Sequence, residues 1–334
     1  MKPLTVPFIL LLFLLASATR LSAQEKGTPQ KGEGIEAFLR RHGHTSPEAK
    51  KQFQELNKGK FASDGGLLLG QDYTLPSVTA AENTVANSYI SVTEPLFGEN
   101  LKNVTLSSNT LAGACFYLVS GHGGPDPGAV SKTEGVELHE DEYAYDITLR
   151  LARNLMEHGA KVDIIIQDEK DGIRDDKHLP NSKRETCMGN EIPLDQTLRL
   201  RQRCETINAL ARKNTEKYKR AIFIHVDSRR VKEQIDVFLY HAPKSTLGKR
   251  LADNIRNTIE EKYDQHQPNR GFKGTVSARR LYVLQHSNPV AAFLELGNIQ
   301  NEKDRKRLVI PNNRQALANW ICQGIIKDYK TANK

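Results

Sequence analysis

From Leu111 onward, short apolar runs alternate with longer segments whose apolar residues recur every three or four positions. The short runs predict buried strands at 114–119, 162–166, 221–226, 281–284 and 291–296. The longer segments predict helices at 141–157, 198–212, 246–263 and 314–329. This alternation predicts an α/β fold, a layered sandwich whose mostly parallel sheet is flanked by helices. About 220 residues are enough to bury one core of this kind.

A glycine-rich turn follows the first of these strands and carries a histidine, in the run Val119-Ser-Gly-His-Gly-Gly-Pro-Asp-Pro-Gly128. Open α/β folds place functional residues at the carboxyl ends of strands, which is the position of His122. His225 and Glu295 close two later apolar runs, and Glu140 opens the helix that follows the turn. Two histidines and a glutamate are a common ligand set for a catalytic zinc ion, and they leave one position for water.

Spacing alone leaves other interpretations open for each of these residues. His225 lies in an alternating apolar strand, where a buried, hydrogen-bonded histidine fits better than a ligand. Acids crowd the start of the helix, where they are ordinary partners of the helix dipole. Spacing therefore does not choose among Glu134, Glu137, His139, Glu140, Asp141 and Glu142, of which Glu142 and His139 are the main alternatives to Glu140. Glu295 is an acid within an apolar run, so it is either functional or a structural hydrogen-bonded group.

Five motifs occur in order: Ser120-Gly-His-Gly-Gly-Pro-Asp-Pro-Gly-Ala129, Glu140 ahead of Gly159-Ala-Lys-Val162, Leu200-x-x-Arg203-x-x-x-Ile207-Asn208, Phe223-Ile-His-Val-Asp227, and Phe293-Leu-Glu-Leu-Gly-Asn-Ile-Gln-Asn301. Their order and wording resemble the zinc-dependent N-acetylmuramoyl-L-alanine amidases (amidase type 3), a family of bacterial cell-wall hydrolases. The resemblance covers roughly residues 111–330. The chain has serine at 120, aspartate at 227 and asparagine at 298, where the family usually has proline, asparagine and phenylalanine. Arg203 and Asn208 are interpreted as structural.

The resemblance implies that His122, Glu140 and His225 bind Zn2+ and that Glu295 is the catalytic general base. An ungapped count back from Gly159 selects Glu140 among the neighbouring acids. The implied reaction is hydrolysis of the amide between N-acetylmuramic acid and L-alanine in peptidoglycan, for cell-wall remodelling or daughter-cell separation. The resemblance also implies peptidoglycan as the binding partner and a possible protein that activates the enzyme. The alternatives are a catalytically inactive peptidoglycan-binding protein and a zinc peptidase that acts on wall peptides.

The N-terminus has the pattern of a secretory signal. Lys2, an apolar stretch from Phe8 to Ala16 and the small residues up to Ala23 predict a signal peptide at residues 1–23. The apolar stretch is too short for a transmembrane helix, which needs about 20 residues. We therefore expect an exported protein, periplasmic or secreted, without stable membrane insertion. The net charge of +8 suits an anionic wall surface, and the scattered basic residues do not predict nucleic-acid binding.

A small unit is expected between the signal and the α/β domain. After a polar tether at 24–31, apolar residues in Gly34-Ile-Glu-Ala-Phe-Leu-Arg-Arg-His-Gly43 recur at helical spacing, and a second short helix follows. The unit closes with the strand-like Leu67-Leu-Leu-Gly-Gln-Asp-Tyr-Thr-Leu-Pro76. Residues 32–76 resemble a LysM module with a βααβ arrangement, which implies binding to peptidoglycan. The alternative is a helical spacer without affinity for sugars.

Two further segments complete the expected organisation. Residues 77–110 are rich in Ser, Thr and Asn and read as a linker that packs along the catalytic domain at 111–332. Residues 168–197 carry extra polar residues relative to the family, and we expect a surface excursion at the rim of the site. Glu185 or Glu191 from this segment is a candidate inhibitory fourth zinc ligand.

The four cysteines do not have the close spacing of a zinc ribbon or a redox pair. Cys115 and Cys322 fall within expected core elements, where buried free thiols are the default. Cys187 and Cys204 flank the end of the 168–197 segment, and export permits a disulfide between them. The sequence leaves that pairing open.

Overall fold

The computed structural model describes residues 25–29, 33–44, 47–62, 65–76 and 91–333. The chain divides into two compact units, one within residues 1–79 and the other within residues 80–334. The expected signal peptide at 1–23 lies outside the described residues, as does the 77–90 part of the expected linker. None of the helices in the described part of the chain is long and apolar enough to cross a membrane.

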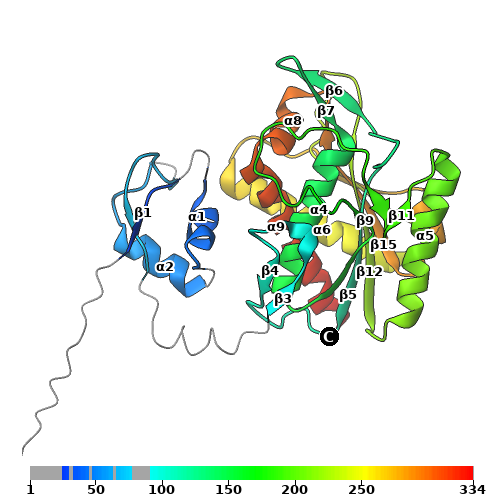
Figure 1. Cartoon of the computed structure of the whole chain (residues 1–334), viewed down its shortest axis with the longest axis horizontal. Coiled ribbons are helices and arrows are strands. Elements are labelled where there is room, and N and C mark those ends of the chain that lie inside the picture. Colours follow the sequence, from blue (N-terminus) through cyan, green and yellow to red (C-terminus); the bar gives the residue numbers. More distant parts are fainter. Residues whose placement is uncertain (1–24, 30–32, 45–46, 63–64, 77–90, 334) are drawn as a thin grey trace, which may run out of the picture. The chain divides into compact units, whose positions relative to one another are not determined.

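The first unit has two short helices and a two-stranded antiparallel sheet (Figure 1). Its elements are β1 (Lys26–Gly27), α1 (Ile35–Arg41), α2 (Pro47–Leu56) and β2 (Tyr73–Thr74). Helices this short depend on tertiary packing, which here comes from a core of Phe38, Leu39, Phe53, Tyr73 and Leu75. The expectation of a tether at 24–31 is wrong at β1, because Lys26 and Gly27 pair with Thr74 and Tyr73.

The second unit begins, in its described part, with β3 (Ser91–Thr93), η1 (Pro95–Phe97) and β4 (Asn103–Thr105). β3 and β4 pair as an antiparallel ribbon. Leu96, Phe97 and Val104 belong to the main hydrophobic core of this unit. Residues 91–110 of the expected linker are therefore folded as part of the second unit.

A six-stranded mixed sheet in the order β14-β13-β15-β12-β5-β8 forms the centre of the second unit. Its strands are β5 (Ala114–Ser120), β8 (Lys161–Ile164), β12 (Tyr218–Asp227), β13 (Phe238–His241), β14 (Thr275–Ala278) and β15 (Val290–Asn298). Neighbouring strands run parallel except at the antiparallel pair β13–β15. The predicted mostly parallel sheet flanked by helices is confirmed.

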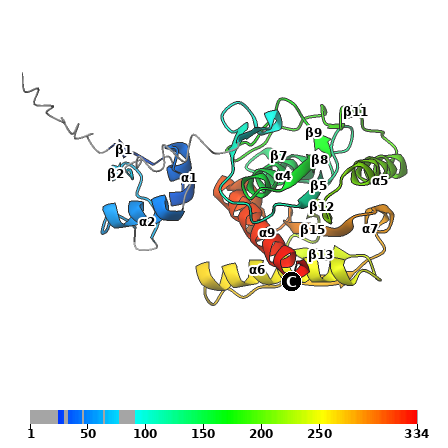
Figure 2. The same ribbon diagram turned by 90° about the horizontal axis from the view of Figure 1, so that it is seen from below.

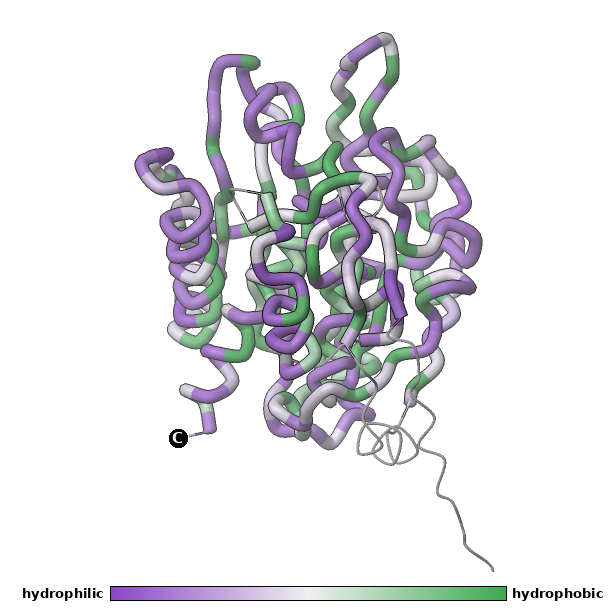
Figure 3. Tube along the Cα trace, turned by 90° about the vertical axis from the view of Figure 1, so that its left-hand side faces the viewer, coloured by the Kyte–Doolittle hydropathy of each residue, from purple (hydrophilic) through white to green (hydrophobic). Residues whose placement is uncertain are grey.

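Helices cover both faces of this sheet (Figure 2). They are α4 (Glu140–Glu157), α5 (Gln196–Lys213), α6 (Thr246–His266), α7 (Tyr282–His286), α8 (Glu302–Val309) and α9 (Pro311–Ala332). Along β5, Phe116 and Leu118 enter the core with α4, α6 and α9, whereas Tyr117 and Val119 enter the core with α5. Burial on both faces explains the uninterrupted apolar run of this strand. Figure 3 shows hydrophobic segments inside the unit and hydrophilic ones on the outer helices.

The prediction of a strand at 281–284 is wrong, because this segment forms the start of the helix α7. The sheet has no place for another strand beside β15, which already pairs with β12 and β13. A run of four apolar residues does not distinguish a strand from a short buried helix. Here Val283 and Leu284 are buried against α5-side residues, and the amides of Leu284 and Gln285 donate to the carbonyl of Leu281.

Several smaller elements surround the sheet. The hairpin of β6 (Val130–Thr133) and β7 (Val136–His139) precedes α4. A three-stranded sheet is formed by β9 (Ile166–Gln167), β10 (Thr186–Cys187) and β11 (Asn190–Glu191). All four cysteines are buried and free, so no disulfide joins Cys187 to Cys204.

Candidate metal centre

The turn after β5 brings His122 close to His225, which lies near the carboxyl end of β12. His122 has a φ of 58°, and Gly123 and Gly124 have φ values of 97° and 63°, all in the left-handed region. A Cβ on Gly121 would lie 2.3 Å from Nδ1 of His225, so only glycine fits at this point. The two imidazole rings lie 5.1 Å apart, centroid to centroid. The approach of the two histidines therefore requires Gly121, and the left-handed backbone of the turn favours Gly123 and Gly124.

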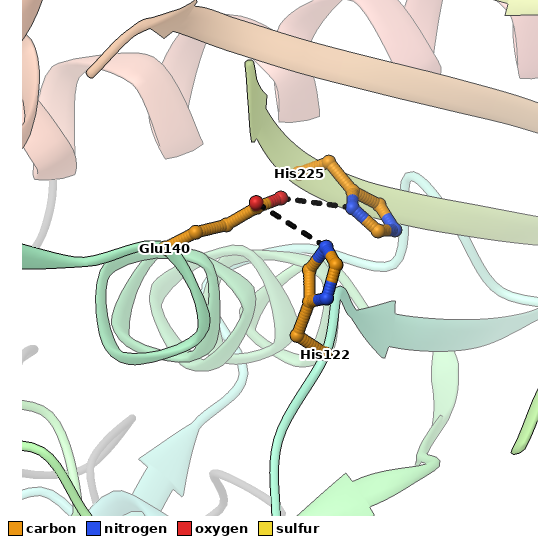
Figure 4. A group of neighbouring side chains, drawn as sticks. All are labelled: His122, Glu140 and His225. Atoms are coloured by element: carbon orange, nitrogen blue, oxygen red, sulfur yellow. Dashed lines mark hydrogen bonds and ion pairs between the residues drawn. The ribbon is translucent and has the colours of Figure 1, made fainter. Parts of the chain in front are cut away.

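Glu140 is the first residue of α4, and its carboxylate lies between the two histidines (Figure 4). Its Oε1 accepts a hydrogen bond from the amide of Val226 at 3.0 Å and lies 2.9 Å from Nδ1 of His225. Its Oε2 accepts a hydrogen bond from the amide of Ala129 at 2.9 Å and lies 3.2 Å from Nε2 of His122. Burial alone would raise the pKa of Glu140, but the two histidines hold it below its usual range.

Asp126 orients His122 from the side away from Glu140. Its Oδ2 lies 2.8 Å from Nδ1 of His122 and accepts a hydrogen bond from Nη2 of Arg199 at 2.5 Å. The hydrogen bond to His122 is the main cause that lowers the pKa of Asp126 to about 2. Burial would lower the pKa of His122, but Asp126 and Glu140 together raise it to about 10. Burial lowers the pKa of His225.

These three side chains fit a divalent metal ion. One ligand atom from each of His122, Glu140 and His225 lies within 4.8 Å of the other two. Ligands of a tetrahedral zinc ion, each about 2.0–2.2 Å from it, lie about 3.3–3.6 Å from one another. Two imidazole nitrogens at 2.9 and 3.2 Å from one buried carboxylate approach this arrangement. The structure thus brings together the three residues that the sequence proposed as ligands, from β12, the turn after β5 and the start of α4.

Glu295 lies beside this group, on β15. It is in register with His225 on the parallel neighbour β12, so the two side chains leave the same face of the sheet. Its Oε2 is buried and has no hydrogen-bond partner in the described part of the chain. Burial, followed by the charges of Glu140 and Asp227, raises its pKa well above the usual value. A cation near this carboxyl would oppose the rise by stabilising its ionised form.

A second acidic group adjoins the first at the start of α4. Ligand-type oxygens of Asp141, Glu142 and Glu185 lie within 4.8 Å of one another. Burial is the main cause that raises the pKa of Asp141 to about 8 and that of Glu142 to about 7. Glu142 is also paired with Nη2 of Arg174 at 2.9 Å. Glu142, which spacing could not separate from Glu140, therefore belongs to this second group. His139 is close to Glu137 instead, at 3.6 Å.

Glu185 supports the glycine turn and is not part of the three-residue group. Its Oε2 accepts a hydrogen bond from the amide of Gly124 at 2.8 Å. Glu191 is exposed on β11. Neither joins the ligand atoms of the histidines, so the structure does not place them as a fourth ligand. The 168–197 segment lies beside the turn, but it is not wholly a surface excursion, since it contains the buried residues Leu179, Ser182, Glu185, Cys187 and Ile192.

Arg203 and Asn208, both on α5, have different surroundings. The buried guanidinium of Arg203 donates a hydrogen bond through Nη2 to the carbonyl of His122, and this contact stabilises the turn. Asn208 donates to the carbonyl of His286 and accepts from the amide of Asn288, in the connection between α7 and β15. Arg203 thus supports the site, and Asn208 supports a loop.

Sequence reasoning assigned no role to Asp126, although its place within the turn motif was a usable signal. A carboxylate four residues after a histidine in a tight turn can accept a hydrogen bond from the imidazole of that histidine. Glu185 was considered only as a metal ligand. Glu185 and Gly124 are 61 positions apart in the sequence, so no local sequence pattern predicts the hydrogen bond between them.

The chain belongs to the N-acetylmuramoyl-L-alanine amidase family, whose model matches residues 117–327. This confirms the family inferred from the five motifs. Among curated proteins, the germination-specific N-acetylmuramoyl-L-alanine amidase of Bacillus subtilis is 26% identical over 227 residues, which cover 65% of this chain and 80% of that protein.

Several similar proteins of known structure are amidases. The CwlD amidase from Clostridioides difficile, in complex with the GerS lipoprotein, is 20% identical, with a TM-score of 0.47 over 65% of this chain and 98% of that chain. The N-acetylmuramoyl-L-alanine amidase AmiC2 of Nostoc punctiforme is 22% identical, with a TM-score of 0.46 over 67% of this chain and 99% of that chain.

Proposed function

We propose that this protein is a zinc-dependent amidase that hydrolyses the bond between N-acetylmuramic acid and L-alanine in peptidoglycan. In this proposal His122, Glu140 and His225 hold the zinc ion, and Glu295 is the general base. The observation that carries it is the convergence of these three side chains beside the unpartnered carboxyl of Glu295, in a chain of the amidase family.

A zinc ion in this position supplies Lewis acidity, which favours ionisation of water and polarises an amide carbonyl. Glu295 takes a proton from the attacking water and later gives one to the departing amine of L-alanine. The rigid strand β15 holds Glu295 level with His225, so little motion is needed for either transfer. Asp126 fixes the ring of His122 with Nε2 toward Glu140, as outer-shell partners of metal-bound histidines do.

Digestion of purified peptidoglycan tests the reaction directly. The expected result is a newly freed amino terminus on L-alanine, with stoichiometric zinc in the purified enzyme. Release of an amino terminus on any other residue would identify a peptidase acting on wall peptides. Binding to the wall with no release at all would identify an inactive binding protein.

We further propose that the first unit is a LysM-like module that binds peptidoglycan and that residues 111–332 form the catalytic domain. The βααβ order of the small unit supports this, with β1 at Lys26–Gly27 added to the expected 32–76 range. Phe53 is fully buried in its core, so Phe53→Asp should unfold this unit alone. The full chain with this change is expected to sediment less with purified wall but to cleave soluble muramoyl peptides at the unaltered rate.

Export is also part of the proposal. Cleavage after residue 23 would release a periplasmic or secreted protein, where its substrate lies. The measurement is the N-terminal sequence of the mature protein. A protein that kept Met1 and remained inside the cell would contradict it. A protein activator would be detected as a partner that raises the turnover of the purified enzyme.

A further inference from the structure

The face of the sheet that carries His225 and Glu295 continues sideways across two more strands. Glu295 is in register with Phe238 on β13, and Phe238 is in register with Thr275 on β14. Paired residues share a face of a sheet, so one row leads from His225 through Glu295 and Phe238 to Thr275. Phe238 is half-buried and Thr275 is exposed, so this row opens toward the β14 edge.

A second row runs beside the first and is mainly aromatic. Phe223, Phe293, Tyr240 and Ser277 are in register across β12, β15, β13 and β14. The ring of Phe293 stacks on His225 at 4.3 Å and lies 6.2 Å from the ring of Tyr240. We call the group formed by Phe238, Tyr240, Phe293, Thr275 and Ser277 the aromatic shelf; Tyr240 is buried within it, and Thr275 and Ser277 are exposed. It begins at the candidate metal centre and ends at the edge strand.

Two arginines lie over this shelf, and only one of them is paired with a carboxylate. Arg229 lies 4.9 Å above the ring of Phe238 and is paired with Asp227 at 2.6 Å. Arg279 lies 4.7 Å above the ring of Tyr240, interacts with the Tyr240 hydroxyl, is exposed, and has no carboxylate partner in the described part of the chain. A guanidinium has five N–H donors, so one that stacks on a ring and contacts its hydroxyl keeps other donors for a planar anion such as a carboxylate.

The order of groups along the shelf indicates which part of a substrate it contacts. If the amide carbonyl lies at the metal centre and Glu295 gives its proton to the departing amine, the chain attached to that amine lies beyond Glu295. The shelf starts there. Two strand spacings, about 10 Å in all, correspond to about three extended residues at about 3.3–3.6 Å each.

We propose that the aromatic shelf binds the stem peptide of the substrate and that Arg279 recognises a free carboxylate on the second or third residue after the cleaved bond. The ligand class is therefore an acidic peptide. This inference rests on the proposed function, because it takes its direction from the role of Glu295. It adds a binding site and a specificity-determining residue to that function.

The test uses the full zinc-loaded chain and two soluble muramoyl peptides that differ only in whether the peptide carboxylates are free or amidated. The wild-type protein is expected to have the lower KM for the free acid. Arg279→Ala should raise that KM about 10-fold, a typical loss for a charge-assisted hydrogen bond, with kcat nearly unchanged. The KM for the amidated peptide should not move, and Arg279→Lys should recover part of the loss.

Arg280→Ala is the matched control, because Arg280 is the exposed neighbour and has no ring contact among the described residues. It should behave as wild type with both peptides. An equal rise in KM for both peptides in Arg279→Ala would show a structural role for Arg279 and overturn the inference. Cleavage of both peptides by the wild type without discrimination would overturn the inference and leave the proposed function standing. If the wild type cleaved neither peptide, both the inference about Arg279 and the proposed function would be overturned.

Discussion

The carboxylate of Glu140 is held by backbone as well as by side chains. Amides of Val226 and Ala129 donate to its two oxygens, so its orientation does not depend on the histidines. A Cβ on Gly128 would lie 2.6 Å from Oε2 of Glu140, so this glycine also gives the carboxylate its room. A ligand fixed in this way loses little conformational freedom when it binds a metal ion.

At this scale the proposed roles of Glu295 as base and His225 as zinc ligand are separable by two substitutions. Glu295→Gln keeps the shape of the side chain and removes the base, so we expect unchanged folding and zinc content with turnover reduced about 10²–10⁴-fold. His225→Ala should lose both zinc and activity. Zinc stoichiometry and amide cleavage, measured on both proteins, check the assignment. Wild-type hydrolysis by Glu295→Gln would remove Glu295 from the mechanism.

The second residue-scale prediction concerns Gly121, which faces the imidazole of His225. Gly121→Ala places a methyl group where the ring now lies, 2.3 Å from Nδ1, so the ring must move. We expect zinc affinity to fall at least about 10-fold, as for other perturbations of ligand orientation. Gly34→Ala is the control, because no atom lies within 4 Å of a Cβ built there. Unchanged zinc affinity in Gly121→Ala would show that the turn is more adaptable than its geometry indicates.

At the scale of elements, the small β9–β10–β11 sheet supports the glycine turn through one side chain. Glu185, which precedes β10, accepts the hydrogen bond from Gly124. Glu185→Ala removes this acceptor, and we expect zinc affinity and turnover to fall about 10-fold. Glu185→Gln retains an acceptor and should be much less affected. Glu191→Ala, an exposed change in the same sheet, should have no effect. Equal behaviour of all three variants would contradict a supporting role.

The long elements were predictable from the sequence because burial gives them a strong pattern. β5, β12, β15 and α4 were expected within a few residues of their bounds. The short strands β13 and β14 were not expected, since runs of four residues are too short to show a clear period. The convergence of His122, His225 and Glu140 followed from strand-end placement and from the family motifs. Contacts such as those of Asp126 and Glu185 depend on tertiary geometry, which no spacing rule supplies.

At the scale of the whole second unit, a buried ion cluster joins α4 to α9. Oδ2 of Asp146 lies 2.8 Å from Nε of Arg150 and 2.5 Å from Nε of Arg314. Its Oδ1 accepts from the amide of Arg174 at 2.8 Å, and Arg314 donates to the carbonyl of that residue at 2.7 Å. The cluster thus links the helix that begins with Glu140, the 168–197 segment and the last helix.

Removing Arg314 should destabilise the protein strongly, because it leaves the buried Asp146 with only part of its counter-charge. For Arg314→Met we expect a loss of about 3–5 kcal/mol in the free energy of unfolding, as for other broken buried pairs. Lys327→Ala breaks an exposed ion pair on the same helix and should cost less than about 1 kcal/mol. Urea unfolding of both variants provides the measurement. Similar losses in the two would argue against the cluster as a main support.

The same cluster predicts how stability depends on pH. Burial would raise the pKa of Asp146, but Arg150 and Arg314 outweigh it and hold the pKa below its ordinary value. The unfolded chain, with a pKa of about 3.9, then binds a proton more readily than the folded one. The contribution is present above about pH 4 and is lost as the pH falls through the lower, folded value. Asp146→Asn should be less stable at pH 7 and lose less stability on acidification, as urea midpoints at several pH values would show.

The placement of Arg314 on α9 also has a consequence for protein synthesis. The ribosome completes Asp146 long before it adds residues 311–332, so the nascent chain carries this carboxylate with Arg150 but without Arg314, its second counter-ion. The contact between Asp146 on α4 and Arg314 on α9 can therefore form only after residues 311–332 have been synthesised. A chain that ends before Arg314 would lack this contact and is expected to be less stable than the full chain.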